Sequence, residues 1–407
     1  MFPELHETFI LRELIALERH GVDFHIYSLQ YPRDPITIDE AIALSENKTS
    51  YAKLISAASL TAFFKTLISR PVKTLSAMGK VIWWGKDRPA EAVKNLAVLP
   101  LTLQFYQLGQ THGITHWHGH WANIPTTACW YLSQIFEVTW SAAIHGEDIF
   151  SKNNFLAKKL DDNAFSVVCS GYFCNHLQSE LGLESPDDVH LNYHGLDPRV
   201  TERAPNRDFN QRSPGDPLKL LSIGRLVPTK GHDVLIKACA KLRDEGIAFS
   251  LQIVGSGPIE AELRELIAQH DLGQHVELRG GMAFADVLDT LESSDVFCLA
   301  PRMIPGQPPD GIPNVIAEAM ALRVPVVTTR VSAIPELVED QVSGFLTPVD
   351  DVDAFAENLK RLSEDPDFAK SISDAAAEKV GFRFDQNRNI SELLDLFRQY
   401  VPGKAVK

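Results

Sequence analysis

The chain has 407 residues, of which 44% are hydrophobic, and this is enough to bury the cores of two or three domains of ordinary size. Its formal net charge of −14 argues against bulk binding of nucleic acid, because a phosphate backbone requires a basic face. We find no signal peptide and no apolar run of about 18 residues, the length that predicts a membrane-spanning helix. The five cysteines form no C-x-x-C pair, which predicts reduced, mostly buried thiols in a cytosolic protein.

The first half of the chain predicts an α/β domain over residues 1–204. Apolar residues at helical spacing predict a helix over 9–19, a strand follows over 23–29, and residues 40–110 are expected to be helical and rich in loops. Short apolar runs predict further strands at 116–121, 140–144, 167–170 and 189–194.

Residues 53–94 combine positive charge with large apolar side chains. Eight cations and two acids give this segment a net charge of +6 inside a chain of −14. The interleaved apolar residues are Phe63, Phe64, Leu67, Ile68, Val81, Ile82, Trp83 and Trp84. A basic amphipathic surface with Trp fits an anionic lipid face, so we predict peripheral contact with the inner face of the plasma membrane. The alternative is a helical subdomain with an aromatic core and solvated lysines.

Histidines gather in the next two strands. His116, His118 and His120 share one face at strand spacing, which can indicate zinc, but no carboxylate is near in sequence and we expect no metal ion. The alternative is that they line a core or a cleft. His145 follows the strand at 140–144 and precedes a glycine, so it is placed to project into the crevice of an α/β domain. His145 is the candidate functional residue of this half, and the alternative is a surface turn.

Residues 205–217 have the Pro, Asn, Asp and Gly content of an interdomain linker. Strands and helices alternate over 218–385, which predicts a second doubly wound parallel sheet. The strands are expected at 218–223, 249–254, 276–278, 296–300, 324–329 and 344–348, and the helices at 233–245, 259–270, 284–292, 314–322 and 350–364. A last helix is predicted within 386–407 from its spacing of apolar residues.

The turn at Gly255-Ser256-Gly257 has the beginning of a dinucleotide-binding pattern. Its third glycine is missing, because position 260 is Glu, and two glycines alone are a weak signal. We interpret the turn as a tight bend beneath a bound nucleotide, with no nicotinamide or flavin site.

Residues 309–321 predict an anion site after the buried strand at 296–300. Pro313 suits the first position of a helix that continues from Asn314, and a helix N-terminus past the carboxyl end of a strand attracts phosphate. The candidate contacts are Gly311, Ile312, Pro313 and Asn314. Glu318 is placed to accept hydrogen bonds from a diol such as ribose. The alternative is an ordinary strand-loop-helix whose acids, Asp310 and Glu318, face water.

Two cations follow the strand at 218–223, in the turn from Gly224 to Gly231. Arg225 offers a fork of donors and Lys230 a compact charge, and together they suit a diphosphate. With the helix N-terminus and Glu318, they describe a site for a nucleoside diphosphate.

These motifs, in this order, resemble glycosyltransferase family 4. The residues that carry the resemblance are Gly224-Arg225-Leu226 with Lys230, then Ile253 to Pro258, then Asp310-Gly311 with Glu318-Ala-Met-Ala321. The resemblance covers nearly the whole chain, although the family usually has Glu where this chain has Asp310. It implies the GT-B fold, in which two Rossmann-like doubly wound domains face each other across a cleft and a carboxyl-terminal helix returns to the first domain.

The resemblance also implies an activity. The protein would move a sugar, with retention of configuration, from a UDP- or GDP-sugar to a glycan or lipid-linked acceptor in cell-surface polysaccharide synthesis, without a metal ion or another cofactor. Arg225 and Lys230 would stabilise the departing diphosphate. Glu318 would hold the ribose, Asp310 would contact the donor sugar, and His145 would orient that sugar through its ring or its carbonyl.

Several alternatives stay open. The family opens with a strand near the middle of the first sheet that is absent here, so either the reading frame begins upstream of Met1, which we favour, or the sheet lacks a member. The same fold also serves phosphorylases and sugar-nucleotide epimerases, which do not release nucleoside diphosphate in an acceptor-dependent way. A non-catalytic protein that only binds a sugar nucleotide is the remaining alternative.

Overall fold

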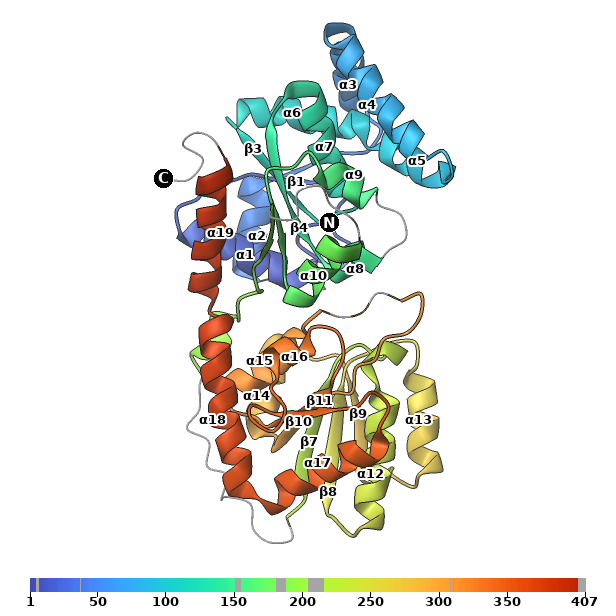
Figure 1. Ribbon diagram of the computed structural model, residues 1–407, viewed down its shortest axis with the longest axis vertical. Coiled ribbons are helices and arrows are strands. Elements are labelled where there is room, and N and C mark those ends of the chain that lie inside the picture. The colour runs from blue at the N-terminus through green and yellow to red at the C-terminus, as the bar shows by residue number, and fades with distance from the viewer. Residues whose placement is uncertain are drawn as a thin grey trace. The chain divides into compact units, whose positions relative to one another are not determined.

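A computed structural model of the chain describes residues 1–4, 7–36, 38–150, 155–180, 188–203, 216–307, 309 and 311–401. The chain divides into two compact units (Figure 1), which are 1–195 together with 387–407, and 196–386. We call them the amino-terminal unit and the carboxyl-terminal unit. The predicted linker at 205–217 lies outside the described residues except for its last two positions, and Asp310 also lies outside them.

The carboxyl-terminal unit is built on a six-stranded parallel sheet in the order β12-β11-β10-β7-β8-β9. Its strands are β7 (Leu218–Ile223), β8 (Phe249–Val254), β9 (Val276–Gly280), β10 (Val296–Cys298), β11 (Val326–Thr329) and β12 (Phe345–Thr347). The chain builds outward from β7 on one side and then from β10 on the other. The topological switch point, where such sheets bind ligands, therefore lies between β7 and β10.

The helices of this unit follow the predicted alternation. They are α11 (Pro198–Thr201), α12 (His232–Asp244), α13 (Glu260–Gln269), α14 (Phe284–Ser293), α15 (Asn314–Ala321), α16 (Ile334–Leu337), α17 (Val352–Glu364) and α18 (Pro366–Arg383), with a 3₁₀ turn at Pro228–Lys230. The sequence analysis missed α18, because its buried face is made largely of small residues such as Ala369, Ser373 and Ala376. Pro313 is the residue before α15 and not its first helical residue, since its ψ of 118° is extended.

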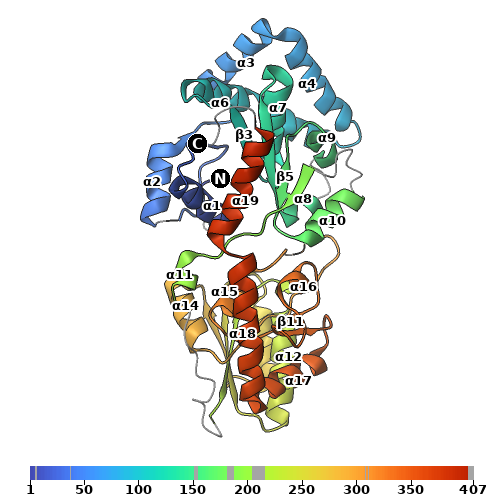
Figure 2. The ribbon, with the colours of Figure 1, turned by 60° about the vertical axis from the view of Figure 1, so that its left-hand side comes forward.

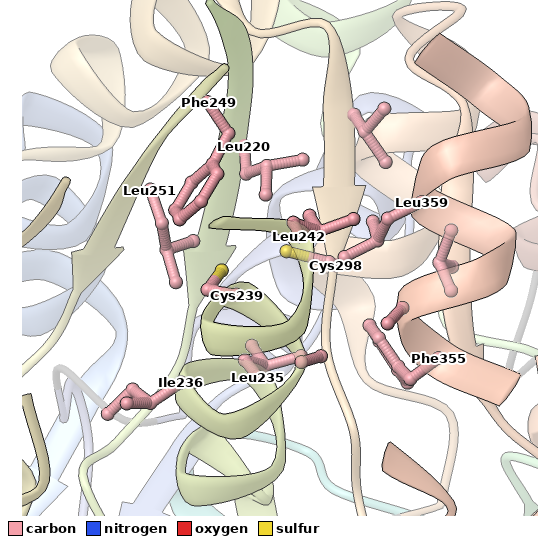
Figure 3. Close-up of a cluster of buried hydrophobic side chains, with 14 of the residues drawn as sticks. Leu220, Leu235, Ile236, Cys239, Leu242, Phe249, Leu251, Cys298, Phe355 and Leu359 are labelled. Atoms are coloured by element: carbon pink, nitrogen blue, oxygen red, sulfur yellow. The ribbon is translucent and has the colours of Figure 1, made fainter. Parts of the chain in front are cut away.

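The core of this unit joins helices from the two sides of the switch point (Figure 3). Leu235, Cys239 and Leu242 of α12 pack in one cluster with side chains from β7, β8 and β10 and with Phe355 and Leu359 of α17. Alternating strand residues and the helical i, i+3, i+4 positions meet in this cluster, which explains why the periodicity located the elements so closely.

The amino-terminal unit has a four-stranded parallel sheet in the order β3-β4-β5-β6, made of β3 (His116–His120), β4 (Thr139–Ile144), β5 (Ser166–Val168) and β6 (Val189–Leu191). Strands β1 (Ile26–Ser28) and β2 (Thr49–Tyr51) form a separate parallel pair. The sequence analysis found no counterpart here of the strand that the family has near the middle of this sheet. In the described part of the chain no strand joins β1 to β3, and the sheet is divided at that place.

Helices surround these strands. They are α1 (Thr8–Arg19), α2 (Asp39–Lys48), α3 (Ala57–Ser69), α4 (Pro71–Trp84), α5 (Pro89–Ala97), α6 (Leu99–Thr111), α7 (Ile124–Phe136), α8 (Gly146–Phe150), α9 (Leu156–Leu160), α10 (Gly171–Glu180) and α19 (Gln386–Tyr400). The last helix, α19, packs in this unit: Leu393 joins a cluster with Phe165, and Leu394 joins one with Leu17 of α1. The predicted return of the carboxyl-terminal helix to the first domain is confirmed. None of the described helices meets the length and hydropathy that crossing a membrane requires.

Candidate functional site

The turn after β7 is held against the carboxyl end of β10. Gly231 has a φ of +66°, and a Cβ at this position would lie 1.8 Å from the carbonyl oxygen of Ala300. Only glycine fits both the left-handed conformation and this contact. Because β7 and β10 are the two strands that border the switch point, the contact places the Gly224–Gly231 turn at that point.

The turns after β7 and β8 are also locked together. The N–H of Leu226 donates to the carbonyl of Ser256 at 2.9 Å, and a Cβ on Gly255, whose φ is +144°, would lie 2.0 Å from the carbonyl oxygen of Gly224. A Cβ on Gly257 would lie 2.3 Å from the carbonyl oxygen of Leu226. The interpretation of Gly255-Ser-Gly257 as a tight bend is therefore confirmed, while a nucleotide above it stays a prediction.

Arg225 and Lys230 lie on this locked turn. Arg225 is exposed, and the methylene carbons of Lys230 lie along Gly224, at 3.5 to 3.7 Å from the place of a Cβ. His232, which is fully buried, supports the turn from beneath: its Nε2–H donates to the carbonyl of Arg225 at 3.2 Å, and its Nδ1 accepts from the hydroxyl of Ser222 at 3.4 Å. Burial lowers the pKa of His232 to about 4, so the ring is neutral and holds this pair of bonds at neutral pH.

Arg302 fixes the other end of the same turn. It follows β10, and its Nε donates to the carbonyl of Pro228 at 2.9 Å while its backbone N–H donates to that of Thr229 at 2.9 Å. Its guanidinium also pairs with Asp233 and, at 2.7 Å, with Asp350. His232 and Arg302 are not predicted from the sequence, because their partners are backbone atoms and side chains of other elements that no motif specifies.

The amino terminus of α15 completes the candidate site after β10. Among the described residues no side chain caps this helix end, and Pro313, which is buried, directs its carbonyl to the N–H of Ile316 at 3.0 Å. Glu318, one turn further along, is 6% exposed, so the alternative in which this acid simply faces water is wrong. Helix N–H groups and a cationic turn thus flank the switch point from its two sides, which is an arrangement that suits an anion.

His145 lies in the amino-terminal unit, at the carboxyl end of β4, and it is 6% exposed. Its ring packs against Phe9 at 4.8 Å, Trp121 at 4.6 Å and His194 at 5.6 Å between ring centres. Neither ring nitrogen has a hydrogen-bond partner in the described residues. The surface-turn alternative is wrong, because this side chain is buried. Burial, helped by neighbouring histidines, holds the pKa of His145 well below its usual value.

The carbonyl of His145 is already engaged. It accepts hydrogen bonds from the N–H groups of Asp148 at 3.0 Å and Ile149 at 3.4 Å, which lie within α8, while the carboxylate of Asp148 accepts from the N–H of His145 at 3.1 Å. Burial raises the pKa of Asp148 to about 6. Of the two routes that the resemblance offered for His145, the geometry favours the ring.

A buried lysine lies behind this element and was also missed. Lys159 is 1% exposed, and burial lowers its pKa to about 7 although Asp148 attracts its charged form. Its Nζ donates at 2.7 to 3.2 Å to the carbonyls of Ala122 and Asn123 and to the hydroxyls of Thr126 and Thr127. These four acceptors lie at the start of α7 and just before it, so Lys159 orders the segment that leads from β3 into α7.

The three histidines of β3 do share one face, as predicted. A carboxylate that is distant in sequence nevertheless lies beside them, since Glu13 of α1 brings an oxygen to 3.1 Å from Nε2 of His120. Ligand atoms of Glu13, His118 and His120 lie within 4.8 Å of one another, and so do those of His145, Cys169 and His194. Both sets contain donors that transition metals accept, so the absence of a bound metal stays a prediction.

Comparison with known proteins adds independent findings. Residues 204–379 match the family described as Glycosyl transferases group 1. The chain is 38% identical over 214 residues to the putative colanic acid biosynthesis glycosyltransferase WcaL of Salmonella typhimurium, covering 51% of each chain. It is also 38% identical over 182 residues to the amylovoran biosynthesis glycosyltransferase AmsK of Erwinia amylovora, covering 44% of this chain and 45% of AmsK. The matched regions thus span about half the length of these curated relatives.

Solved structures share the fold over the whole chain. A glycosyltransferase from Rickettsia africae matches with a TM-score of 0.67 at 15% identity, covering 98% of this chain and 97% of that one. HepE of Anabaena, in complex with UDP-glucose, matches with a TM-score of 0.66 at 18% identity, covering 97% and 96%. Residues 204–379, less than half of the chain, are thus similar to the glycosyl transferases group 1 family, and the two Rossmann-like units have the GT-B fold.

Proposed function

We propose that the protein is a retaining, metal-independent glycosyltransferase of family 4 that transfers a sugar from UDP- or GDP-sugar to a glycan or lipid-linked acceptor. The observation that carries this proposal is the cationic turn of Arg225 and Lys230, locked by Gly231 to the end of β10 at the switch point. The family match over residues 204–379 and the similarity to relatives named for colanic acid and amylovoran synthesis support the class of reaction and a place in cell-surface polysaccharide synthesis.

The proposed chemistry places fixed positive charge where the leaving group gathers negative charge. As the bond between the sugar and the diphosphate breaks, Arg225, Lys230 and the N–H groups of α15 stabilise the departing diphosphate. Backbone locks at Gly231 and Gly255 and the bond from His232 hold this turn before the reaction begins, so little reorganisation is needed. These groups do the electrostatic work that a divalent ion does in other enzymes that use sugar nucleotides.

The remaining residues have finer roles. Glu318, nearly buried one turn inside α15, accepts hydrogen bonds from the ribose hydroxyls, and Gly255, Gly311, Ile312, Pro313 and Asn314 supply backbone contacts to the nucleotide. Asp310 contacts hydroxyls of the donor sugar. The ring of His145 orients that sugar, since its nitrogens are the polar atoms of this residue without a partner in the described structure. The departing diphosphate itself accepts the acceptor's proton, which gives retention without a second carboxylate nucleophile.

A ligand screen tests the donor site. UDP, GDP and their hexose derivatives are titrated in turn into the protein while its melting temperature is followed. A ligand at about 100 times its Kd stabilises the folded state by about 2.7 kcal/mol, and we expect one base to give this response. Absence of any shift, and of any calorimetric heat, with every sugar nucleotide would contradict the proposal.

The competing assignments differ in their products. Acceptor-dependent release of free nucleoside diphosphate is expected of neither a phosphorylase nor an epimerase. A non-catalytic binder releases no nucleoside diphosphate at all. We expect acceptor-dependent release of UDP or GDP. We also propose peripheral contact of residues 53–94 with an anionic membrane, which would bring the protein to a lipid-linked acceptor.

A further inference from the structure

Helices α3 and α4 are apolar on two faces. Their inward faces, with Ala62, Thr66, Ala77 and Val81, are buried in the amino-terminal unit. Their outward faces carry a second set of large apolar residues, which we call the outer stripe: Leu60, Phe64, Ile68, Val72, Leu75, Ile82 and Trp83. In α3 these residues are four positions apart, and in α4 the positions 72, 75, 82 and 83 fall within about 100° of one another around the helix, so each set lies on one face of its helix.

The outer stripe is strongly exposed. Ile68 is 81% exposed, Val72 79% and Trp83 69%. The most exposed pair, Ile68 and Val72, lies at the junction of α3 and α4, and both helices lie at the edge of the unit in the two views (Figures 1 and 2). Single exposed apolar residues are common, but seven on two consecutive helices mark an interaction surface.

Each of the two interpretations of residues 53–94, an aromatic core and an exposed surface, accounts for part of the segment. Trp84 belongs to the core, since its ring lies 4.7 Å from that of the buried Trp130, and Phe63 packs against the same core. Phe64, Ile82 and Trp83 face outward. The aromatic residues of the segment are therefore both a core and an exposed surface, and the core alone does not explain them.

The charges around the outer stripe fit an anionic lipid surface. Residues 53–86 contain six cations and no acid, in a chain whose net charge is −14. Three of them turn toward α7 and its end, since Arg70 donates to the carbonyl of Ile135, Lys80 donates to Gln134 and Lys73 pairs with Glu137. Lys53, Lys65 and Lys86 are the exposed cations left to meet an anionic surface. Lys86 lies 5.0 Å from the ring centre of Trp83, and Lys65 is exposed beside Phe64. Lysine beside tryptophan is the combination that settles at the level of lipid headgroups, with the ring in the acyl boundary and the ammonium in water.

We propose that the outer stripe inserts into the headgroup region of an anionic lipid bilayer, with α3 and α4 lying flat on its surface. Neither helix is long enough to span a bilayer, which agrees with a binding mode in the plane of the interface. The inference sharpens the membrane contact proposed above. It does not depend on the donor chemistry, because lipid binding is measured without a sugar nucleotide.

Vesicle sedimentation with the full chain tests the proposal. We expect binding to vesicles of phosphatidylglycerol and phosphatidylcholine, and at least tenfold weaker binding to phosphatidylcholine alone. Ile68→Glu/Val72→Glu should lower partition at least tenfold by placing charge in the inserted face, and Lys53→Glu/Lys65→Glu should reduce it toward the value for neutral vesicles. The matched control is Ile42→Glu/Val342→Glu, which adds the same charge at residues that are 42% and 49% exposed elsewhere, and it should bind nearly as wild type does.

A spectroscopic readout identifies the inserted residue. Vesicles should shift the tryptophan emission to shorter wavelength, and Trp83→Phe should remove most of that shift while leaving the melting temperature unchanged. Equal partition of wild type and Ile68→Glu/Val72→Glu would overturn the proposal. So would a wild-type dimer that Ile68→Glu dissociates and that does not bind vesicles, because the outer stripe would then be a contact between copies of the chain.

Discussion

The two units hold their polar groups in different ways. In the carboxyl-terminal unit the histidine beneath the site, His232, has partners for both ring nitrogens within ten residues of chain, and the cationic turn above it rests on backbone contacts. In the amino-terminal unit His145 is just as well buried, yet neither ring nitrogen has a partner in the described residues. The turn of the carboxyl-terminal unit is thus held by its own hydrogen bonds, whereas the ring of His145 is held by packing against its aromatic neighbours.

The two sites also differ in whether their geometry is set by residues close together in the chain or by residues far apart in it. Glycines in fixed turns shape the proposed donor side, and such turns are visible as motifs in the sequence. The environment of His145 comes from Phe9, Trp121 and His194, which lie on different elements. A motif of three or four letters carries no information about such neighbours.

The largest expected effect concerns the preorganised charges. Lys230→Ala should lower the transfer rate about 10²–10³-fold, the usual loss when one preorganised electrostatic contact to a transition state is removed. Lys237→Ala removes a cation from the same unit that pairs with Asp233 at 3.5 Å on the exposed side of α12, and it should keep nearly full activity. Steady-state release of nucleoside diphosphate is the measurement, and equal activity of the two variants would reject the assignment of Lys230.

Glycine substitutions test the backbone locks. Gly231→Ala should destabilise the carboxyl-terminal unit by about 3 kcal/mol, because it combines a left-handed conformation with a collision against the carbonyl of Ala300. Gly246→Ala is the control, since Gly246 has a φ of +74° but no atom within 4 Å of the added Cβ. It should lose about 1 kcal/mol. Chemical denaturation followed by circular dichroism would measure the difference, and similar losses would show that the contact at Ala300 does not lock the turn.

Acid should weaken the amino-terminal unit through its neutral histidines. Burial lowers the pKa of His118 to about 3 and that of His194 to about 4, from an ordinary value of 6.5. Below pH 6.5 the unfolded chain binds protons that the folded unit does not, so stability is lost as pH falls from 6.5 toward 4. Each such histidine contributes about 1.4 kcal/mol per pH unit in that range.

Denaturation midpoints between pH 7.5 and 5 would measure this slope for the wild type and for His194→Asn, which should have a shallower slope by about 1.4 kcal/mol per unit. Glu13 and Arg12 are the charged groups whose fields act on His194, and His120 is a further titratable neighbour. An unchanged slope in His194→Asn would mean that this ring is charged or hydrated in the folded protein.

The smallest expected effect is that of a chelator. Because Arg225 and Lys230 are proposed to supply the positive charge that stabilises the departing diphosphate, EDTA should leave turnover unchanged. Loss of turnover that zinc or magnesium restores would contradict metal independence. If Glu13→Gln then removed the response, the group of Glu13, His118 and His120 would be the metal site.

Sequence periodicity gave no bounds for α7 or α10 of the amino-terminal unit, but it located the strands of the carboxyl-terminal unit to within two residues, with β7 and β8 at their observed bounds. It did so because apolar residues on parallel strands and on one helix face are repeated at fixed spacing. It missed α18, whose buried side chains are small, and it did not foresee that β1 and β2 pair apart from the four-stranded sheet. Strand partners are chosen by contacts between distant segments, which spacing does not encode.

The sequence by itself determined the order of strands and helices, the positions of the glycine turns and the presence of Arg225, Lys230 and Glu318 beside them, because each depends on residues close in the chain. Tertiary structure alone decided that Glu13 pairs with His120 and that Arg302, which follows β10, bonds to the turn after β7. It also decided that Lys159 is buried, with its pKa lowered to about 7. The physical reason is that burial and pairing depend on the three-dimensional neighbours of a group, and those neighbours come from segments far apart in sequence.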